Sequence, residues 1–161
     1  MFVVFLQSDD CIRVCLLSRG LGDVYKRQDG GEAPVAPGIG FFDHMLTALA
    51  FYAGFGLELQ ADGDLHVDGH HTVEDVGIVL GTAFRQALGD RVGIRRFGSA
   101  FVPMDEALCL TVADCSNRPF LVFDAPMPPP MLGSYDSCLT KELMRAFSVH
   151  GCLTPHPSSQ S

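Results

Sequence analysis

The sequence predicts an α+β fold in which helices cover one face of a mostly antiparallel sheet. Long segments carry apolar residues at helical spacing, and short segments alternate apolar and polar residues. Their order along the chain is helix, hairpin, helix, several strands and helix. With 161 residues, 47% of them hydrophobic, the chain is long enough for one domain with a real core and too short for a second full domain.

Three helices are expected from the apolar repeats. Gly54 and Gly89 follow the first two and should end them. The apolar positions are Phe42, Met45, Leu46, Leu49 and Ala53 in the first helix (41–53); Val73, Val76, Leu80, Ala83, Phe84 and Ala87 in the second (72–88); and Leu139, Leu143, Ala146 and Phe147 in the third (137–149).

Strands are expected between these helices. Residues 57–68 (LELQADGDLHVD) alternate in polarity on either side of a Gly-containing turn, which is typical of an antiparallel hairpin. Further strands are predicted at 100–103, 108–114 and 120–124, followed by a proline-rich loop at 126–130. The polar residues 157–161 are interpreted as a frayed tail.

Residues 1–28 stand apart from the predicted domain, which spans 29–156. They lack a clean helical or strand period, and residues 16–28 (LLSRGLGDVYKRQ) look like a translated sequencing adapter. We therefore hypothesise that this segment is foreign to the gene. Genomic reads from a related source that run unbroken through it would contradict the hypothesis.

Composition excludes several classes of partner. The net charge of -8, with only 11 Lys and Arg residues, argues against a nucleic-acid surface. The six cysteines form neither C-x-x-C zinc pairs nor a disulfide scaffold, so a reducing cytoplasm is expected. Neither a signal peptide nor a membrane-spanning segment is expected. A small anionic substrate would have to be bound by a few placed arginines.

The run His70-His71-Thr72-Val73-Glu74-Asp75 starts the clearest predicted helix. Glu74 is four residues after His70 and three after His71, so helical geometry lets the carboxylate and both imidazoles converge on one ion. Nitrogen and oxygen donors of this kind suit manganese, iron, zinc or nickel, and the spacing does not choose among them.

A purely structural interpretation competes with this metal site. Two histidines and a glutamate also make an ordinary polar helix start, since the helix dipole favours the carboxylate there. The metal interpretation gains from His44, which also starts a predicted helix after a Gly-rich loop. Metalloprotease chemistry fits poorly, because a zincin needs H-E-x-x-H with the glutamate between the histidines.

Five segments of the chain closely resemble imidazoleglycerol-phosphate dehydratases, in the same order and at family-like separations. They are GIGFFDHML (38–46), GDLHVDGHHTVEDVG (63–77), GIRRFG (93–98), PMDEA (103–107) and DCSNRP (114–119). The resemblance covers about residues 29–156 and is highly specific. It implies the family's duplicated ribosomal-protein-S5-domain-2-like fold, with the second half incomplete.

The resemblance also implies a reaction and a site. The reaction is the dehydration of imidazoleglycerol phosphate, a small phosphorylated imidazole, to imidazoleacetol phosphate in histidine biosynthesis, by a metal-dependent carbon–oxygen lyase (hydro-lyase). Two manganese ions serve each complete site, which lies between subunits of a cage-like homo-oligomer of twenty-four copies. The implied residues are His44, His70, His71, Glu74 and His156 as metal ligands, His71 and Glu74 as catalytic residues, and Arg96 and Arg118 as substrate-phosphate ligands.

Three departures from the family limit what is expected of this chain. Residues 1–28 lack the family's R-x-T-x-E-T-like strand, Tyr52 stands where the family usually has a histidine, and the second H-H-x-x-E motif is absent. We therefore expect little or no turnover from this chain alone. Asp75, Asp105 and Glu106 are expected to have supporting roles. The alternatives are a non-catalytic metal-binding or assembly fragment, and a structural domain with incidental histidines.

Overall fold

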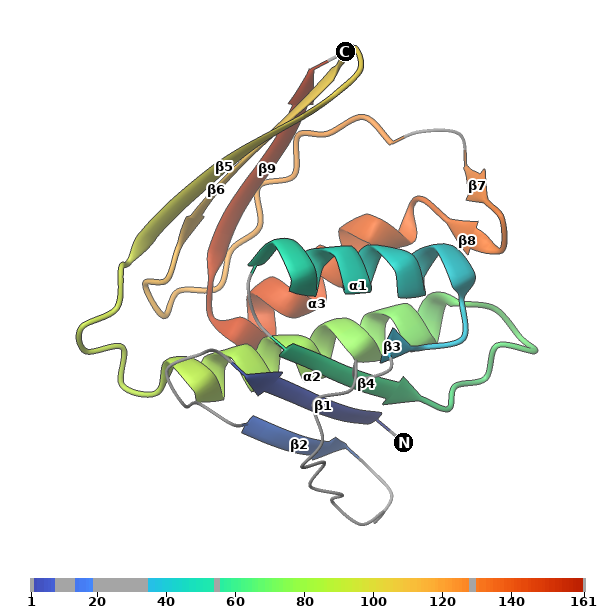
Figure 1. Ribbon diagram of the computed structural model, residues 1–161, viewed down its shortest axis with the longest axis horizontal. Helices are drawn as coiled ribbons and strands as arrows, with labels where there is room; N and C mark the ends of the chain where they lie inside the picture. The colour runs from blue at the N-terminus through green and yellow to red at the C-terminus, as the bar shows by residue number, and fades with distance from the viewer. Residues whose placement is uncertain (1, 8–13, 19–34, 54–55, 128–129, 161) are drawn as a thin grey trace.

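The computed structural model describes residues 2–7, 14–18, 35–53, 56–127 and 130–160. Its helices pack against the first of two main sheets, and the second projects away from them (Figure 1). The helices are α1 (Gly40–Ala53), α2 (His70–Leu88) and α3 (Leu139–Gly151). The first sheet has the order β2 (Val14–Ser18), β1 (Phe2–Gln7), β4 (Gly56–Ala61), β3 (Val35–Ala36), and the second has the order β5 (Phe97–Met104), β6 (Ala107–Asp114), β9 (Thr154–Gln160).

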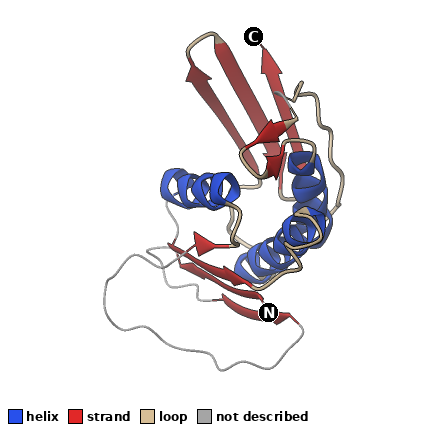
Figure 2. Ribbon diagram, turned by 90° about the vertical axis from the view of Figure 1, so that its right-hand side faces the viewer, coloured by secondary structure: helices blue, strands red, loops and turns tan. Residues whose placement is uncertain are grey.

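The α+β class with mostly antiparallel pairing is confirmed. Only β3 and β4 pair in parallel among the named strands of the described chain. The strands are divided between two main sheets and a small hairpin of β7 (Met131–Leu132) and β8 (Tyr135–Asp136). The described strands form two main sheets where one was expected, and Figure 2 shows the helices on the side of the first sheet that faces the second.

The three predicted helices are confirmed, with α2 beginning two residues earlier than expected. The backbone of α2 ends at Gly89, whose positive φ of 54° suits a residue without a Cβ. The hydrophobic core between the helices and the first sheet is formed mainly by apolar side chains from α1, α2 and β4. Its most deeply buried members include Phe42, Leu46, Leu59, Val73, Val76 and Ala83.

The hairpin β7–β8, which the sequence did not predict, adds one aromatic residue to this core. The Tyr135 ring is buried and stacks on Phe42 at 5.7 Å between centroids. Its hydroxyl shares a 2.9 Å hydrogen bond with Thr140 Oγ1. Burial raises the pKa of Tyr135, so the ring stays neutral in its apolar surroundings.

Helices α2 and α3 approach so closely that two glycines of α2 cannot be replaced freely. A Cβ on Gly81 would lie 2.6 Å from Phe147 O and 2.9 Å from Gly151 N. A Cβ on Gly77 would lie 2.8 Å from Ala146 Cβ. One face of α2 is therefore buried against α3, and another face of the same helix is buried against the first sheet.

The hairpin predicted for residues 57–68 is wrong. Its first half is β4, but β4 pairs with β1 and β3, so neither of its edges is left for residues 65–68. Those residues instead turn towards α2, and Val67 N donates to Asp64 O at 2.8 Å. The alternating pattern was real for β4 and continued by chance into the turn.

The tail predicted to fray is β9, the third strand of the second sheet. The segment 120–124, predicted as a strand, runs beside β9 with a single isolated bridge at Asp124. Val122 N donates to Pro155 O at 3.2 Å, and Asp124 N donates to Pro157 O at 3.0 Å. The N–H and C=O of a strand residue point the same way, so the prolines' missing N–H groups fall on this side and leave the pairing with β6 intact.

No helix in the described part of the chain is both long and apolar enough to cross a membrane.

Candidate functional site

The loop before α2 packs its backbone against the first turn of the helix. A Cβ on Gly63 would overlap Thr72 Oγ1 and lie 3.1 Å from Thr72 Cβ, so any other residue there would force the loop or the Thr72 side chain to shift. Asp68 Oδ1 accepts a hydrogen bond from His70 N at 2.8 Å and holds the first residue of the helix. The loop thereby fixes the residue at which α2 begins, and with it the positions of both predicted histidine ligands, His70 and His71.

His71 is oriented by Asp64 from the same loop. His71 Nδ1 and Asp64 Oδ2 are 2.8 Å apart. The hydrogen bond raises the pKa of His71 and lowers the pKa of Asp64, and their opposite charges add to both shifts. With Nδ1–H donated to the carboxylate, Nε2 is the ring atom left to face an ion or a substrate.

His70 and Glu74 occupy successive turns of α2, as the sequence predicted. His70 Nε2 and Glu74 Oε2 are 3.8 Å apart, and both side chains are partly exposed. The His70 and His71 rings stand nearly perpendicular, with centroids 6.1 Å apart. Across the described residues, no three His, Cys, Asp or Glu side chains are placed to hold one ion together.

The two remaining predicted ligands lie on other elements. His44 is exposed on α1, next to Asp43, whose carboxylate accepts a 3.3 Å hydrogen bond from Ile39 N. His156 is exposed on β9, paired with Val112 of β6. The predicted ligands therefore lie on three separate elements, α1, α2 and β9. A metal site that used all of them would need side chains from outside the start of α2.

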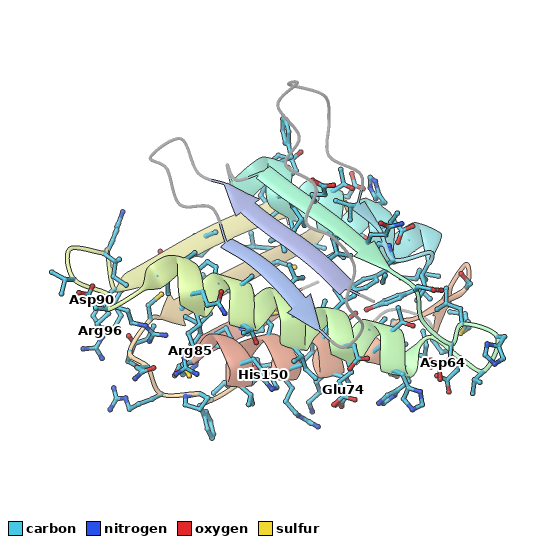
Figure 3. All side chains as sticks on the ribbon, turned by 90° about the horizontal axis from the view of Figure 1, so that it is seen from below. Asp64, Glu74, Arg85, Asp90, Arg96 and His150 are labelled. Atoms are coloured by element: carbon cyan, nitrogen blue, oxygen red, sulfur yellow. The ribbon has the colours of Figure 1, made fainter. Side chains whose placement is uncertain are left out.

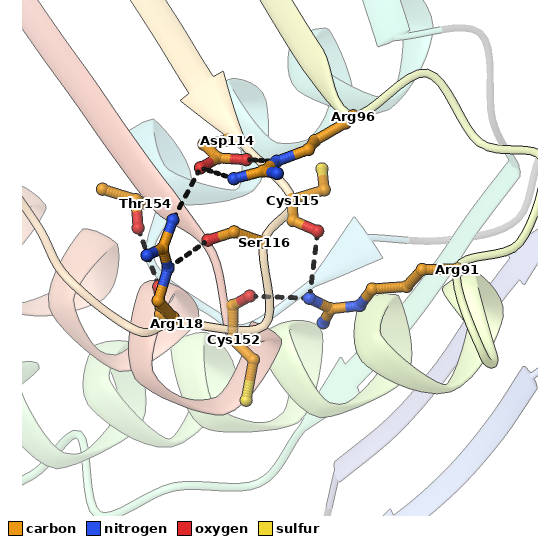
Figure 4. Close-up of polar contacts among 8 residues, drawn as sticks. All are labelled: Arg91, Arg96, Asp114, Cys115, Ser116, Arg118, Cys152 and Thr154. Carbon is orange, nitrogen blue, oxygen red and sulfur yellow. Dashed lines mark hydrogen bonds and ion pairs between the residues drawn. The ribbon is translucent and has the colours of Figure 1, made fainter.

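Arg96 and Arg118, the predicted phosphate ligands, meet at Asp114 (Figure 4). Arg96 donates from Nε to Asp114 Oδ1 at 2.7 Å and from Nη2 to Oδ2 at 3.0 Å. Arg118 Nη2 is 3.8 Å from Asp114 Oδ2, and its Nε donates to Ser116 Oγ at 3.4 Å. The hydrogen bonds from Arg96 are the main reason that the pKa of Asp114 is lowered.

Arg91, which sequence reasoning missed, fastens the backbone beneath this arginine pair. Its Nη1 donates to Cys115 O at 3.2 Å and to Cys152 O at 3.1 Å, and its Nη2 donates to Gly151 O at 3.0 Å. One side chain thus joins the loop after β6 to the end of α3. Its place in the loop after α2 gave no signal of this role.

Other residues singled out in the sequence have simpler places. Asp105, with a φ of 49°, and Glu106 form the two-residue turn between β5 and β6. Asp75 and Tyr52 are exposed on α2 and α1. The supporting roles expected of Asp75, Asp105 and Glu106 stay predictions.

Asp64 and Glu74, beside the two histidines, lie at one end of α2, and Arg96 of the arginine pair lies at the other (Figure 3). A helix of 19 residues is about 28 Å long, several times the length of a small phosphorylated imidazole. One such molecule cannot reach both ends at once.

Comparison with known proteins identifies the family. The family model described as imidazoleglycerol-phosphate dehydratase matches residues 37–160. Two curated relatives named imidazoleglycerol-phosphate dehydratase are 56% identical over 131 residues (Gluconobacter oxydans, 81% of this chain and 66% of the relative) and 57% identical over 126 residues (Acidiphilium cryptum, 78% of this chain and 64% of the relative).

A solved structure agrees with these relatives. The crystal structure of imidazoleglycerol-phosphate dehydratase from Staphylococcus aureus matches with a TM-score of 0.76 and 30% identity, over 97% of this chain and 83% of that one. The chain spans slightly less than two thirds of the length of the two curated relatives. The match extends through both the histidine and the arginine groups, and the chain belongs to the imidazoleglycerol-phosphate dehydratase family.

Proposed function

We propose that this chain contributes to the dehydration of imidazoleglycerol phosphate to imidazoleacetol phosphate, a step of histidine biosynthesis. The observation that carries the proposal is the pairing of a family-like His70-His71-x-x-Glu74 start of α2 with a two-arginine cluster at Asp114. Imidazole nitrogens and a carboxylate suit a metal that binds the substrate ring, and arginines suit the substrate phosphate. This is carbon–oxygen lyase chemistry, and we place it in the cytoplasm.

Manganese is the metal that we propose for the α2 start, where the nitrogen and oxygen donors suit it as they suit iron, zinc or nickel. His70, His71 and Glu74 are the residues that would hold it, with His44 and His156 as further proposed ligands. A bound manganese ion would supply Lewis-acid polarisation of the imidazole ring that leaves the neighbouring hydroxyl easier to expel. The chain's own residues orient this end, because Asp64 fixes which nitrogen of His71 is free.

The phosphate end of the substrate is assigned to Arg96 and Arg118. Planar guanidinium groups donate paired hydrogen bonds to phosphate oxygens, so they set the substrate's register while chemistry proceeds at the ring. We assign His71 and Glu74 as the catalytic residues at that ring. Fixing both ends of the molecule aligns the departing hydroxyl and proton with the groups that receive them.

The separation of the two groups along α2 supports a site shared between copies of the chain. We propose a homo-oligomer, in the full-length family a cage, as the active form. A single copy offers either ring contacts or phosphate contacts to a given molecule, and we therefore expect little or no turnover from this chain alone. Purified chain that dehydrated imidazoleglycerol phosphate at a normal rate would contradict this expectation.

A non-catalytic metal-binding or assembly fragment is the second candidate. It is favoured by the same observation that limits turnover: one copy keeps His70 and Glu74 3.8 Å apart at the start of α2, while its two arginines lie at the other end of that helix. Any dehydration activity measured in the presence of manganese separates the two candidates, since the first allows a low rate and the second allows none.

The first experiment is thermal unfolding of the chain with and without manganese. A ligand that binds only the native state stabilises it, by about 2.7 kcal/mol at a hundredfold excess over its dissociation constant, and this raises the melting temperature by several degrees. We expect manganese to stabilise the parent chain and not the His71→Ala variant. His150→Ala on α3 is the matched control, and it should keep the full manganese response.

The same measurement can remove the proposal. A cooperative transition that is indifferent to manganese in the parent chain would leave the α2 start as an ordinary polar helix terminus. An equal loss of response in His71→Ala and His150→Ala would mean that general destabilisation, and not ligand loss, was measured.

A further inference from the structure

The carboxylate of Asp114 lies beneath the two arginines proposed to bind phosphate. It ends β6 and pairs in register with Phe97 at the start of β5, so Arg96 directly precedes its partner position. Cys115 N donates to Arg96 O at 2.9 Å and fixes that approach through the backbone. The Asp114 side chain is 21% exposed, whereas those of Arg96 and Arg118 are 50% and 76% exposed.

The atoms that Arg96 uses decide what it has left. Its bonds to Asp114 run through Nε and Nη2, one edge of the guanidinium. A guanidinium carries five N–H groups, so the Nη1–Nη2 edge keeps donors for a second anion. Asp114 thus holds Arg96 from the inner edge and leaves the outer fork available. Arg118 uses Nε for Ser116 and places Nη2 towards the same carboxylate.

Charge balance gives the carboxylate a second effect. Two guanidinium groups brought together repel one another, and each long side chain loses rotamer entropy when it is fixed. A carboxylate shared between them offsets the repulsion and reduces the freedom that must be lost when an anion binds. The cluster keeps one net positive charge, which still attracts a phosphate.

We propose that Asp114 is a positioning residue of the phosphate site, which holds Arg96 and Arg118 in the orientation that grips a phosphate without touching the phosphate itself. The proposal rests on the assignment of the two arginines to the substrate phosphate. The alternative is that Asp114 competes with phosphate for Arg96 and must be displaced. A competitor would occupy the Nη1–Nη2 edge of Arg96, whereas Asp114 occupies the Nε–Nη2 edge.

Titration with inorganic phosphate, followed by isothermal calorimetry on the full chain, tests this. We expect Asp114→Ala to weaken phosphate binding about tenfold, the loss that corresponds to one charge-assisted hydrogen bond. Asp114→Asn keeps the shape of the side chain but removes its charge, and it should weaken binding in the same direction. Asp124→Asn is the matched control, with the same change of net charge on an exposed neighbouring segment, and should bind as the parent does.

A double-mutant comparison separates positioning from general support of the fold. If Asp114 acts through the arginines, Asp114→Ala should add no further loss in an Arg96→Ala, Arg118→Ala background. A loss that persisted there would overturn the proposal, as would tighter or unchanged phosphate binding in the Asp114 variants. If the parent chain and all its variants ignored phosphate, this inference and the phosphate assignment would fall together. Weakening by the arginine variants but not by the Asp114 variants would leave the proposed function standing.

Discussion

At the scale of single residues, the contacts that organise the candidate site mostly join residues of different elements, and not residues at helical spacing on one helix. The His70–Glu74 spacing could be predicted, because both lie on one helix where separation along the chain fixes separation in space. Asp64 could not be found as the partner of His71, because a hairpin interpretation placed it in a distant turn. The contact of Asp114 with Arg96 depends on the pairing of β5 with β6, and the contacts of Arg91 depend on where α3 ends. Neither could be predicted from spacing along the chain.

Gly63→Ala tests the fit of the loop against α2. The added methyl would overlap Thr72 Oγ1, so the loop must move and carry Asp64 away from His71. We expect a loss of roughly 1–3 kcal/mol of stability, the usual range for overpacking, and a weaker response to manganese. Thermal unfolding with and without manganese measures both effects.

Gly98→Ala is the control for this change, since a Cβ there meets nothing within 4 Å. It should leave stability and the manganese response nearly unchanged. A Gly63→Ala chain with the parent's stability and manganese response would show that the loop adapts and does not set the position of His71.

At the scale of elements, the three helices and the strands β5 and β6 were predicted, whereas the hairpin at 57–68 and the frayed tail were wrong, for one physical reason. The apolar repeat of α1, α2 and α3 is a local property of the sequence, whereas strand partners are chosen across the whole chain. β4 found its partners in β1 and β3, and not in the residues that follow it. β9 is polar and holds two prolines, and its strand character comes from the neighbours on both its sides.

Gly81→Ala tests the packing of α2 on α3. Alanine normally stabilises a helix interior by about 1 kcal/mol over glycine. Here the Cβ would lie 2.6 Å from a backbone oxygen, which cannot rotate away as a side chain could. We therefore expect the sign to reverse, with a net loss of roughly 2 kcal/mol or more, measured by chemical denaturation.

Gln86→Ala on the exposed side of α2 is the control for helix propensity, and its effect should be within about 0.5 kcal/mol. An increase in the stability of Gly81→Ala would mean that α3 shifts easily and that the close approach is not required.

At the scale of the whole molecule, the second sheet projects away from the helices (Figure 1), and several of its apolar side chains are exposed. Every residue of β5 is exposed, including Phe101 at 66% and Met104 at 72%. Adjacent strand residues point to opposite faces, so Phe101 and Val102 leave both faces of β5 apolar. Sheet edges and faces of this kind favour self-association, against which a net charge of -8 gives only general repulsion.

Phe101→Lys should lower the concentration-dependent association of the chain, measured by sedimentation velocity, because it removes an exposed ring from an edge strand. Ser99→Lys adds the same charge to the same face of β5 without removing an apolar group, and its effect should be smaller. Equal effects of the two changes would mean that charge, and not the uncovered ring, governs association.

Because the histidine group and the arginine group lie a helix length apart on α2, a mutation can damage one group or both. The number of groups damaged should decide how strongly a defective copy lowers the activity of an assembly with normal copies. In an assembly of mixed chains with shared sites, a copy damaged at one end inactivates one site, and the loss follows the gene dose. A copy damaged at both ends inactivates two sites, each of which also contains an intact neighbour. Such an allele would reduce activity faster than its own abundance.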